Sequence, residues 1–260
     1  MSTSKAVLIT GCSTGIGRAT AQHLANGGWT VYATARRVES LSGLDGCRTL
    51  ALDVTDEASM QAAVDTVVAE HGAVGVLINN AGYSQSGAVE SVPMDEVRRQ
   101  FETNVFGLTR MCQLVLPGMR EQRWGKIVNI SSMGANFVFP GGGFYHATKY
   151  AVDALSDALR FEVRGFGVDV IIVQPGLIKT EFGNAAVGES TQGVYESGPL
   201  GKLGGGPEAV AKAIEKAITA RRPKARYRVT PSAHILIRQR ALMTDRMWDT
   251  MMRTQFPQPK

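Results

Sequence analysis

The sequence predicts an α/β protein built on a parallel sheet, and three observations support this fold class. Short runs of β-branched or other apolar residues alternate with helical patterns along the chain, which is typical of βαβ units. A glycine-rich turn at 10–17 joins the first such run to the first helical pattern. No internal repeat and no long linker divides the 260 residues, so one domain accounts for the whole chain.

Seven short segments are predicted as strands, because each is an apolar or β-branched run of strand length. They are 6–10, 30–35, 49–52, 74–78, 126–130, 169–173 and 226–229. Five segments have a helical pattern: 17–26, 57–70, 94–119, 145–164 and 207–220. Asp56 stands where its side chain can cap the second helix, and Pro207 occupies a first-turn position that proline favours.

The composition is that of an ordinary globular protein, with 44% hydrophobic and 20% charged residues. No run of about 18 apolar residues is present, and residues 1–5 lead into the first strand without a signal-peptide pattern. The three cysteines and four histidines are too scattered for a disulfide framework or a metal site. We therefore expect a cytoplasmic protein in a reducing compartment, with no transmembrane segment and no structural metal.

Positive charge is concentrated at the C-terminal end. Residues 221–260 hold ten Arg or Lys against two Asp, whereas the net charge of the whole chain is only +5. A nucleic-acid-binding surface would spread its basic residues differently, so we expect no nucleic-acid partner. The stretch 233–252 is amphipathic and basic, and it predicts one helix or two short ones. Three roles remain open for it: packing on its own domain or covering the substrate cleft, peripheral contact with an anionic membrane, and a subunit interface.

The turn at 10–17 reads TGCSTGIG and lies between the first strand and the first helix. In this context glycines allow a tight turn and let a pyrophosphate approach the backbone and the positive end of the helix. The alternative is a glycine-rich turn without a ligand. Because strand, turn and helix follow in the right order, the sequence favours a dinucleotide site.

The end of the second predicted strand indicates which dinucleotide binds. Arg36 and Arg37 stand there, and no Asp or Glu occupies the place of an acceptor for the ribose 2′-hydroxyl. Arginine offers a planar set of donors that suits a 2′-phosphate, so NADP(H) is favoured over NAD(H). The alternative is a pair of solvated surface arginines. Asp53, after the third strand, is predicted either to accept a hydrogen bond from the adenine or to cap a helix.

Tyr145 and Lys149 are four residues apart in a helical pattern, which puts the phenol and the ammonium on one helix face. A nearby cation favours the phenolate of a tyrosine, whose ordinary pKa is about 10. Ser132, thirteen residues before Tyr145, supplies a hydroxyl to hold the oxygen that gains or loses the proton. Together they indicate a proton-transfer device for alcohol–carbonyl chemistry. His146 points away from Tyr145 around the helix and is interpreted as a surface or packing residue.

In these motifs the chain resembles the short-chain dehydrogenase/reductase family, over about residues 5–231. Six segments follow the order of the family along the chain. They are the glycine turn at 10–17, NNAG at 79–82, Asn104 in TNVFG, Ser132, Tyr145 with Lys149, and PG at 175–176 with Thr180. The glycine spacing is that of the family rather than of the G-x-G-x-x-G fingerprint, and no catalytic position departs from the pattern.

The resemblance implies the architecture in more detail: a single doubly wound Rossmann domain with a seven-stranded parallel sheet and helices on both faces. We expect residues 1–231 to form the dinucleotide-binding catalytic domain, with a substrate loop at 176–206. Residues 232–260 are expected to form a C-terminal amphipathic helical extension of the same domain. A homodimer or homotetramer is expected, because the family commonly assembles through its long helices.

The resemblance also implies the site residues. The expected catalytic residues are Asn104, Ser132, Tyr145 and Lys149. Tyr145 would protonate a carbonyl oxygen aligned by Ser132 while the nicotinamide delivers hydride to the carbon. Lys149 would stabilise the tyrosinate and hold the nicotinamide ribose, and Asn104 would keep a water in line with Lys149. The expected cofactor contacts are Gly11, Ser13, Thr14, Gly15, Ile16, Gly17, Arg36, Arg37, Asp53, Val54, Asn80, Ala81, Gly82, Tyr145, Lys149, Pro175, Gly176, Ile178 and Thr180.

The leading hypothesis is an NADP(H)-dependent oxidoreductase for a small hydrophobic secondary alcohol or ketone, steroid-, retinoid- or lipid-like. VYAT at 31–34 and the extended C-terminus resemble the 17β-hydroxysteroid/retinol dehydrogenase-like branch. Phe137, Phe139 and Phe144 either line an apolar pocket or pack in the core, and the loop at 176–206 is either a lid or disordered. The alternatives are a β-ketoacyl thioester reductase, whose acidic partner would meet the basic tail, and a non-catalytic NADP(H)-sensing module.

Overall fold

Seven parallel strands form the sheet at the centre of the fold, in the order β3-β2-β1-β4-β5-β6-β7. The computed structural model describes residues 3–179 and 203–256. The strands are β1 (Val7–Ile9), β2 (Val31–Ala35), β3 (Arg48–Ala51), β4 (Val76–Asn79), β5 (Gly125–Ile130), β6 (Val168–Pro175) and β7 (Arg226–Val229). All seven predicted strands are present, and their ends differ from the prediction by no more than two residues.

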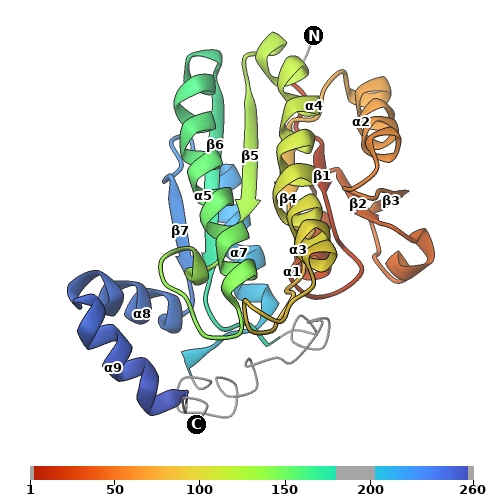
Figure 1. Ribbon diagram of the computed structural model, residues 1–260. Helices are drawn as coiled ribbons and strands as arrows, with labels where there is room; N and C mark the ends of the chain where they lie inside the picture. Colours follow the sequence, from red (N-terminus) through yellow and green to blue (C-terminus); the bar gives the residue numbers. More distant parts are fainter. Residues whose placement is uncertain (1–2, 180–202, 257–260) are drawn as a thin grey trace.

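Helices cover both faces of the sheet (Figure 1). They are α1 (Gly15–Asn26), α2 (Glu57–His71), α3 (Met94–Phe101), α4 (Leu108–Glu121), α5 (Gly143–Val163), α7 (Pro207–Thr219), α8 (Pro231–Leu242) and α9 (Asp245–Gln255). Asp56 caps α2 as predicted, because its Oδ1 accepts the backbone N–H groups of Ala58 and Ser59. Pro207 begins α7, also as predicted.

The single helix predicted over 94–119 is interrupted. A π-helical turn at Glu102–Gly107 separates α3 from α4. A Cβ on Gly107 would lie 2.3 Å from the Val54 carbonyl oxygen, so the turn packs directly against the backbone that follows β3. The helical pattern of the sequence has no break at this point. The wider turn instead accompanies the contact with Val54, which lies far away in the sequence.

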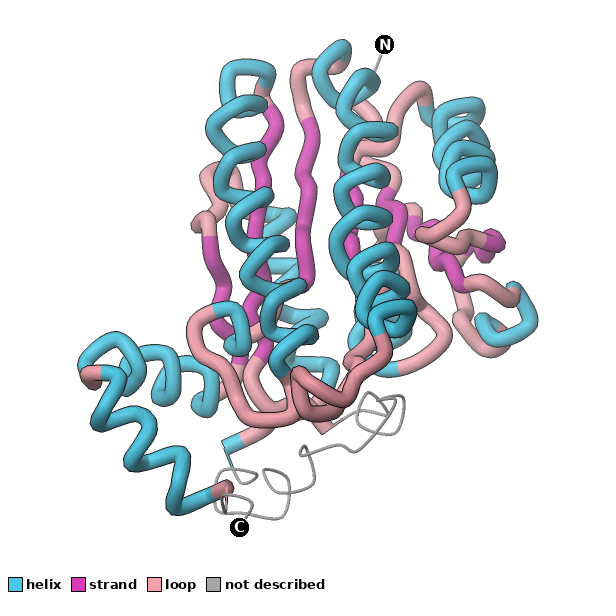
Figure 2. The backbone as a smooth tube through the Cα atoms, in the orientation of Figure 1, coloured by secondary structure: helices cyan, strands magenta, loops and turns pink. Residues whose placement is uncertain are grey.

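Alternation along the strands divides the main core into two layers. Leu8 and Leu77 pack with apolar side chains of α2, α4 and α5 on one face of the sheet. Val7 and Ile9 face the other way and pack with α1 and α7. Figure 2 shows the long helices running alongside the strands. This is the doubly wound arrangement that the resemblance implied.

A third apolar cluster lies where α8 and α9 meet the segment after β5, beside the carboxyl ends of the strands (Figure 1). We call it the C-terminal cluster; its buried members are Met133, Phe137, Ala233, Leu236, Ile237, Trp248 and Met252. The basic stretch near the C-terminus therefore forms two helices, and both pack on their own chain. No described helix has both the length and the apolar character required to cross a bilayer.

Candidate active site

The turn between β1 and α1 forms a backbone cradle. Gly11 and Gly15 have φ of +73° and +58°, the left-handed region that glycine enters without strain. A Cβ on Gly17 would lie 2.3 Å from the Gly11 carbonyl oxygen and 2.4 Å from Nδ2 of Asn80, so glycine is required for this close approach. Thr14 is the N-cap of α1, and its side chain makes no capping bond within the described chain. The first N–H groups of α1 thus face the cradle as donors for an anion.

Asn80 holds the cradle together. Its Nδ2 donates to the carbonyl oxygens of Thr10 at 3.0 Å and Gly11 at 2.8 Å. The Thr10 hydroxyl accepts the backbone N–H groups of Asn80 and Ala81, at 3.0 Å each. A Cβ on Gly11 would lie 2.8 Å from Cα of Ala81, so the loops after β1 and β4 touch. Asn80 and Ala81 were predicted as cofactor contacts; the structure shows them bracing the cradle, with Thr10 as an unpredicted partner.

The remaining predicted residues of these loops lie at the same end of the sheet. Ser13 and Ile16 are half-buried in the turn, and Gly82 is exposed after β4. β1 and β4 are adjacent although they are not consecutive, so the loops flank the point at which the strand order reverses. Open α/β sheets bind ligands at that point. The glycine cradle and the N-terminus of α1 therefore fit the diphosphate of a nicotinamide dinucleotide.

Arg36 and Arg37 follow β2 directly, and both are exposed. Neither forms an ion pair with another described residue. Arg18 of α1 is engaged instead, because its Nη2 donates to the Ser42 carbonyl oxygen at 2.5 Å. Within residues 3–179 and 203–256, these two arginines have no carboxylate partner, and they stand at the strand end that flanks the adenosine ribose in this type of fold.

Asp53 does not cap a helix. Its Oδ1 accepts the backbone N–H of Thr55 at 2.9 Å and the Thr55 hydroxyl at 2.8 Å, a local turn after β3. The capping role belongs to Asp56. Val54 is buried, and its carbonyl oxygen faces Gly107. The predicted contact of Asp53 with the adenine stays a prediction.

Ser132, Tyr145 and Lys149 come together at the carboxyl end of β5 and the start of α5. Lys149 Nζ lies 5.7 Å from the centroid of the Tyr145 ring, one helical turn away. The Ser132 hydroxyl is hydrogen-bonded to Tyr145. Lys149 is buried, and its Nζ donates to the Ile130 carbonyl oxygen at 2.8 Å, which fixes the ammonium against the last residue of β5.

Burial has the largest effect on the acidity of Tyr145 and Lys149. It raises the pKa of Tyr145 to about 12, against the opposing hydrogen bond from Ser132. It lowers the pKa of Lys149 to about 8, against the opposing charge of Asp153. The sequence led us to expect a phenolate favoured by the lysine; instead, loss of solvent dominates because burial disfavours a charge on either group. Burial therefore strengthens the preference of Tyr145 for the protonated phenol.

Asn104 lies in the π-helical turn and is buried. Its Oδ1 accepts the backbone N–H of Tyr83 at 3.1 Å, and its Nδ2 donates to the Tyr83 carbonyl oxygen at 2.9 Å. Nδ2 also donates to the Thr148 hydroxyl at 3.1 Å. The side chain thus joins the loop after β4 to α5, at the residue before Lys149.

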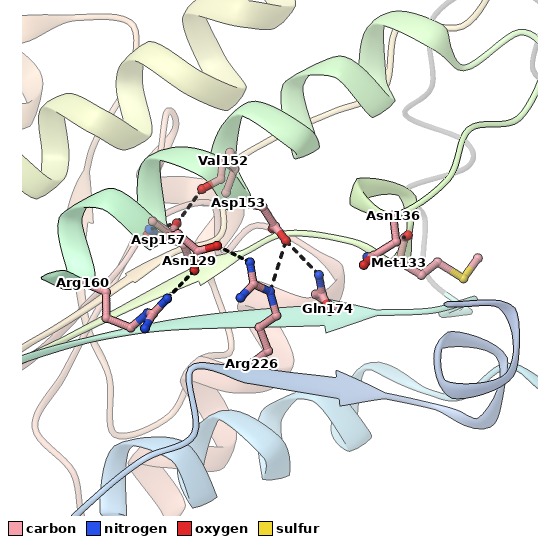
Figure 3. A network of polar contacts seen from close by, with 10 residues as sticks. Asn129, Met133, Asn136, Val152, Asp153, Asp157, Arg160, Gln174 and Arg226 are labelled. Carbon is pink, nitrogen blue, oxygen red and sulfur yellow. Dashed lines mark hydrogen bonds and ion pairs between the residues drawn. The ribbon is translucent and has the colours of Figure 1, made fainter. Parts of the chain in front are cut away.

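A polar network continues from the pair along α5 and is shown in Figure 3. Asp153, one turn beyond Lys149, accepts from Nε2 of Gln174 at 2.9 Å and lies 3.5 Å from Nε of Arg226. Arg226 also pairs with Asp157 at 2.5 Å. Burial raises the pKa of Asp153, with the neighbouring donors and Arg226 opposing that effect. The sequence analysis did not single out Asp153; its spacing of four residues from Lys149 was the available signal.

Gly176, after β6, lies under the start of α8. A Cβ there would be 2.3 Å from the Ser232 hydroxyl oxygen and 2.4 Å from the Thr230 hydroxyl oxygen. The Ser232 hydroxyl also accepts the backbone N–H of Leu177 at 3.0 Å. Close packing of α8 therefore accounts for the glycine, independently of any ligand.

The structure describes some of the other residues predicted in the segment after β6. Pro175 ends β6, and Ile178 forms an isolated parallel bridge with Gly205. Both stand at the same edge as the cradle and Ser132, as expected for the carboxyl ends of parallel strands. Thr180, and residues 180–202 of the predicted substrate loop, lie outside the described residues.

Phe137 is a core residue rather than the wall of an open pocket. It is 1% exposed, and its ring centroid lies 5.3 Å from that of Trp248. Phe139 is half-buried, with its ring 5.0 Å from Phe137 and 6.3 Å from Phe256. Phe144 is half-buried in the first turn of α5. The C-terminal cluster thus packs against the segment that begins at Ser132.

Comparison with known proteins agrees with this arrangement. The sequence profile of short chain dehydrogenases matches residues 5–190. A 3-ketodihydrosphingosine reductase of Bacteroides thetaiotaomicron is 38% identical over 260 residues, covering 95% of this chain and 96% of that protein. An NADPH-dependent 3-dehydrocapnine reductase of Ornithobacterium rhinotracheale is 34% identical, covering 93% of this chain and 94% of that protein.

A solved structure extends the similarity to three dimensions. A short-chain dehydrogenase from Streptomyces avermitilis superposes with a TM-score of 0.79 at 37% identity, covering 97% of this chain and 99% of that one. The chain therefore belongs to the short-chain dehydrogenase/reductase family of nicotinamide-dependent oxidoreductases.

Proposed function

We propose that this chain uses NADPH to reduce a ketone carried by a hydrophobic molecule, with Tyr145 as the proton donor. The observation that carries the proposal is the phenol of the half-buried Tyr145, hydrogen-bonded to Ser132 and one helical turn from the ammonium of Lys149. The phenol is protonated at neutral pH, as its ordinary pKa of about 10 already ensures, and burial raises that pKa further to about 12. The protonated phenol is the form that carbonyl reduction requires.

Each residue of the group then has a distinct task. Tyr145 donates its proton to the carbonyl oxygen, and the Ser132 hydroxyl aligns that oxygen. Lys149, held by Ile130, lies close enough to stabilise the tyrosinate that results. Asn104 keeps α5 in place against the loop after β4. NADPH, when bound, supplies the hydride. Proton transfer of this kind typically accelerates a reaction about 10²–10⁴-fold.

The choice of NADP(H) over NAD(H) is supported at the end of β2. The exposed Arg36 and Arg37 suit a 2′-phosphate, and the sequence has no Asp or Glu at the end of β2, where an acceptor for a 2′-hydroxyl would stand. The cradle from Gly11 to Gly17 would hold the diphosphate. The relative from Ornithobacterium rhinotracheale is named as NADPH-dependent, which supports the same choice.

A hydrophobic substrate is supported by the position of the C-terminal cluster, whose apolar side chains lie against the segment that begins at Ser132. The named substrates of the two relatives, 3-ketodihydrosphingosine and 3-dehydrocapnine, are the first to test. Steroid and retinoid carbonyls follow, because we retain the 17β-hydroxysteroid/retinol dehydrogenase-like branch as part of the proposal. A β-ketoacyl thioester is the second candidate; the exposed Arg238 and Arg246 favour an acidic carrier.

We further propose a homodimer or homotetramer formed through the outer helices. Phe161 of α5 is 70% exposed and Phe106, just before α4, is 55% exposed. Large apolar side chains on an outer surface favour burial against a second copy. Light scattering after size-exclusion chromatography tests this proposal, and a monomer at micromolar concentration would contradict it.

We also propose how the chain is divided into domains and in which compartment the protein is found. We propose that residues 232–260 belong to the same domain as residues 1–231, because the described helices α8 and α9 pack on the segment after Ser132. The cysteines Cys12, Cys47 and Cys112 are free thiols, which favours a reducing compartment, and we propose the cytoplasm.

The test of this function is the initial rate of NADPH and NADH oxidation with 3-ketodihydrosphingosine, 3-dehydrocapnine, steroid ketones, retinal and a β-ketoacyl thioester. We expect NADPH-selective turnover that Tyr145→Phe lowers at least about 10²-fold. Tyr150→Phe, which removes a hydroxyl from an exposed tyrosine of the same helix, is the matched control. Tight NADPH binding without turnover would favour the sensing module, and a preference for NADH would overturn the assignment of Arg36 and Arg37.

A further inference from the structure

His146 follows Tyr145 in the first turn of α5, and it is only 5% exposed. The ring fits between two glycines. A Cβ on Gly134 would lie 2.4 Å from Nδ1 of the imidazole, and a Cβ on Gly142 would lie 3.1 Å from Nε2. Glycine at these two positions leaves the space that the imidazole fills, so the ring has a fixed place beside Tyr145.

The hydrogen-bond partners of the imidazole fix its tautomer. Nε2 lies 3.2 Å from the backbone nitrogen of Phe139, and a backbone N–H can only donate, so Nε2 is the acceptor. Nδ1 then carries the proton and donates to the Gly134 carbonyl oxygen at 2.9 Å. Burial lowers the pKa of His146, against the opposing bond to Gly134, which favours the neutral ring. The imidazole is therefore a clamp with a donor at one end and an acceptor at the other.

The donor end of the clamp leads to Ser132. Gly134 is held by His146 through its carbonyl group, and its N–H donates to the Ser132 hydroxyl oxygen at 3.0 Å. Ser132 is the N-cap of the short 3-10 turn Met133–Ala135, so this bond also sets the conformation of its side chain. Because the oxygen accepts from Gly134, the hydroxyl proton is directed away from Gly134, toward Tyr145 and a substrate oxygen.

The acceptor end of the clamp leads to the aromatic side chains. The backbone of Phe139 is held by Nε2, and its ring lies 5.7 Å from the imidazole. The same ring contacts Phe137 and Phe256, and so joins the C-terminal cluster. One imidazole thus connects the hydroxyl of Ser132 with the apolar side of the site.

We infer that His146 is a positioning residue with two separable tasks. Its Nδ1–H fixes the orientation of the Ser132 hydroxyl through Gly134, and its Nε2 fixes Phe139 and the apolar side of the substrate site. This inference rests on the proposed function, because that function assigns Ser132 to the carbonyl oxygen and the C-terminal cluster to the hydrophobic substrate.

Two amide substitutions separate the tasks. In His146→Asn the amide nitrogen stands one bond from Cγ, as Nδ1 does, so the donor to Gly134 is kept and the acceptor for Phe139 is lost. In His146→Gln the amide oxygen stands two bonds from Cγ, as Nε2 does, so the acceptor for Phe139 is kept and the donor is lost. His234→Gln, at an exposed histidine of α8, is the matched control.

The two variants should differ in which kinetic constant changes. We expect His146→Gln to lower kcat about tenfold with little change in KM for the ketone, as for the loss of one hydrogen bond that acts at the transition state. We expect His146→Asn to raise that KM about tenfold with kcat within about threefold of the wild type. The control should change neither constant. Equal factors in kcat and KM for both variants would overturn the inference, because a general loss of structure acts on both.

Amide hydrogen exchange measured by NMR gives a readout without turnover. The Phe139 amide should exchange at least about tenfold faster in His146→Asn, and the Gly134 amide in His146→Gln, because each loses its own bond or the support for that bond. Unchanged exchange at both amides in both variants would overturn the clamp. If the wild-type protein turns over no ketone, the proposed function fails, and the exchange rates alone still decide whether His146 holds these two residues.

Discussion

The two halves of the site are built in opposite ways. The half formed by the loops after β1, β2 and β4 offers backbone groups and exposed arginines, and its tightest contacts join glycines to main chain. The half formed by β5, α5 and the segment after Ser132 contains buried ionisable side chains, among them Lys149, Asp153 and His146. Binding a phosphate requires fixed donors, whereas moving a proton requires a controlled pKa.

This difference predicts which property of the protein a substitution in each half will change. In the cofactor half the position of the main chain matters most, so substitutions there should change cofactor affinity and leave the chemical step intact. In the catalytic half burial sets the protonation states, so substitutions should change kcat and its dependence on pH. Four variants test this division, and each could break it.

The largest effect is expected for Lys149→Met. Removal of the ammonium beside Tyr145 should lower kcat at least about 10²-fold. Stability should change in the opposite direction. The pKa of Lys149 falls from an ordinary 10.5 to about 8 in the folded protein, so the unfolded chain binds this proton more tightly and the protonated lysine destabilises the fold below pH 8. The variant should therefore be more stable than the wild type at pH 7.

The difference in stability between the variant and the wild type should depend on pH. Between about pH 8 and 10.5 only the unfolded wild-type chain keeps the proton on Lys149, so wild-type stability rises with pH and the advantage of the variant shrinks. Urea unfolding of both proteins at pH 7 and pH 10 measures it. A variant that is less stable than the wild type at pH 7 would contradict a dominant cost of burial.

Gly17→Ala probes the cofactor half. The added Cβ would meet the Gly11 carbonyl oxygen and Asn80, so the two loops must move apart. Overpacking of about 1–3 kcal/mol corresponds to a loss of NADPH affinity of about 10–100-fold. Isothermal titration calorimetry measures the affinity, and kcat at saturating NADPH should stay near wild type. Gly165→Ala, which meets no atom within 4 Å, is the control. An equal loss of kcat would show that the halves are not separable.

Alanine at both Arg36 and Arg37 tests the cofactor choice. Loss of charge-assisted hydrogen bonds to a 2′-phosphate, about 1.5–3 kcal/mol, should raise the KM for NADPH about 10–100-fold. The KM for NADH, which has no 2′-phosphate, should remain within about threefold, and kcat should be unchanged. Alanine at both Arg221 and Arg222, two exposed arginines between α7 and β7, controls for the loss of two positive charges. A parallel increase in both KM values would refute the 2′-phosphate contact.

The smallest effect is expected for Asp153→Asn. The negative charge of Asp153 opposes the lowering of the Lys149 pKa by burial, so its removal should lower that pKa further. If protonated Lys149 is the active form, activity falls as pH rises through its pKa, and in the variant this fall should begin at lower pH. The profile of kcat between pH 6 and 10 measures the shift. If kcat falls at the same alkaline pH in the variant and in the wild type, Asp153 does not affect the pKa of Lys149 and only holds Gln174 and Arg226.

Local patterns explain what the sequence could predict. The strands, the cap at Asp56 and the glycine turn depend on neighbouring residues, and their spacing is visible in the chain. The meeting of Ser132 with Tyr145 and Lys149 could be predicted because two of the three share one helix face and the third matched a known pattern. The fold class followed from the alternation of strands and helices.

Contacts between distant segments explain what the sequence could not predict. The helix predicted over 94–119 is interrupted where Gly107 meets Val54, and the sequence of residues 94–119 does not indicate this contact. His146 was interpreted as a surface or packing residue from its direction on the helix, and it is buried. Its hydrogen bond to Gly134 could not be predicted, because Gly134 lies on a loop whose path depends on the sheet. The pKa of Tyr145 was misjudged for the same reason: spacing shows a neighbouring charge, but burial depends on the whole fold.

The contact between Gly176 and Ser232 couples the start of α8 to the end of β6, which limits how these parts can be exchanged between proteins. A side chain at 176 would collide with the hydroxyl that begins α8, and loss of that hydroxyl would leave the Leu177 N–H without its acceptor. The added Cβ would also lie 2.4 Å from the Thr230 hydroxyl oxygen, so a change of Ser232 alone would not make room for it. A chimera that takes its C-terminal helices from a relative must therefore also take that relative's residues after β6, so that the helices can pack against them.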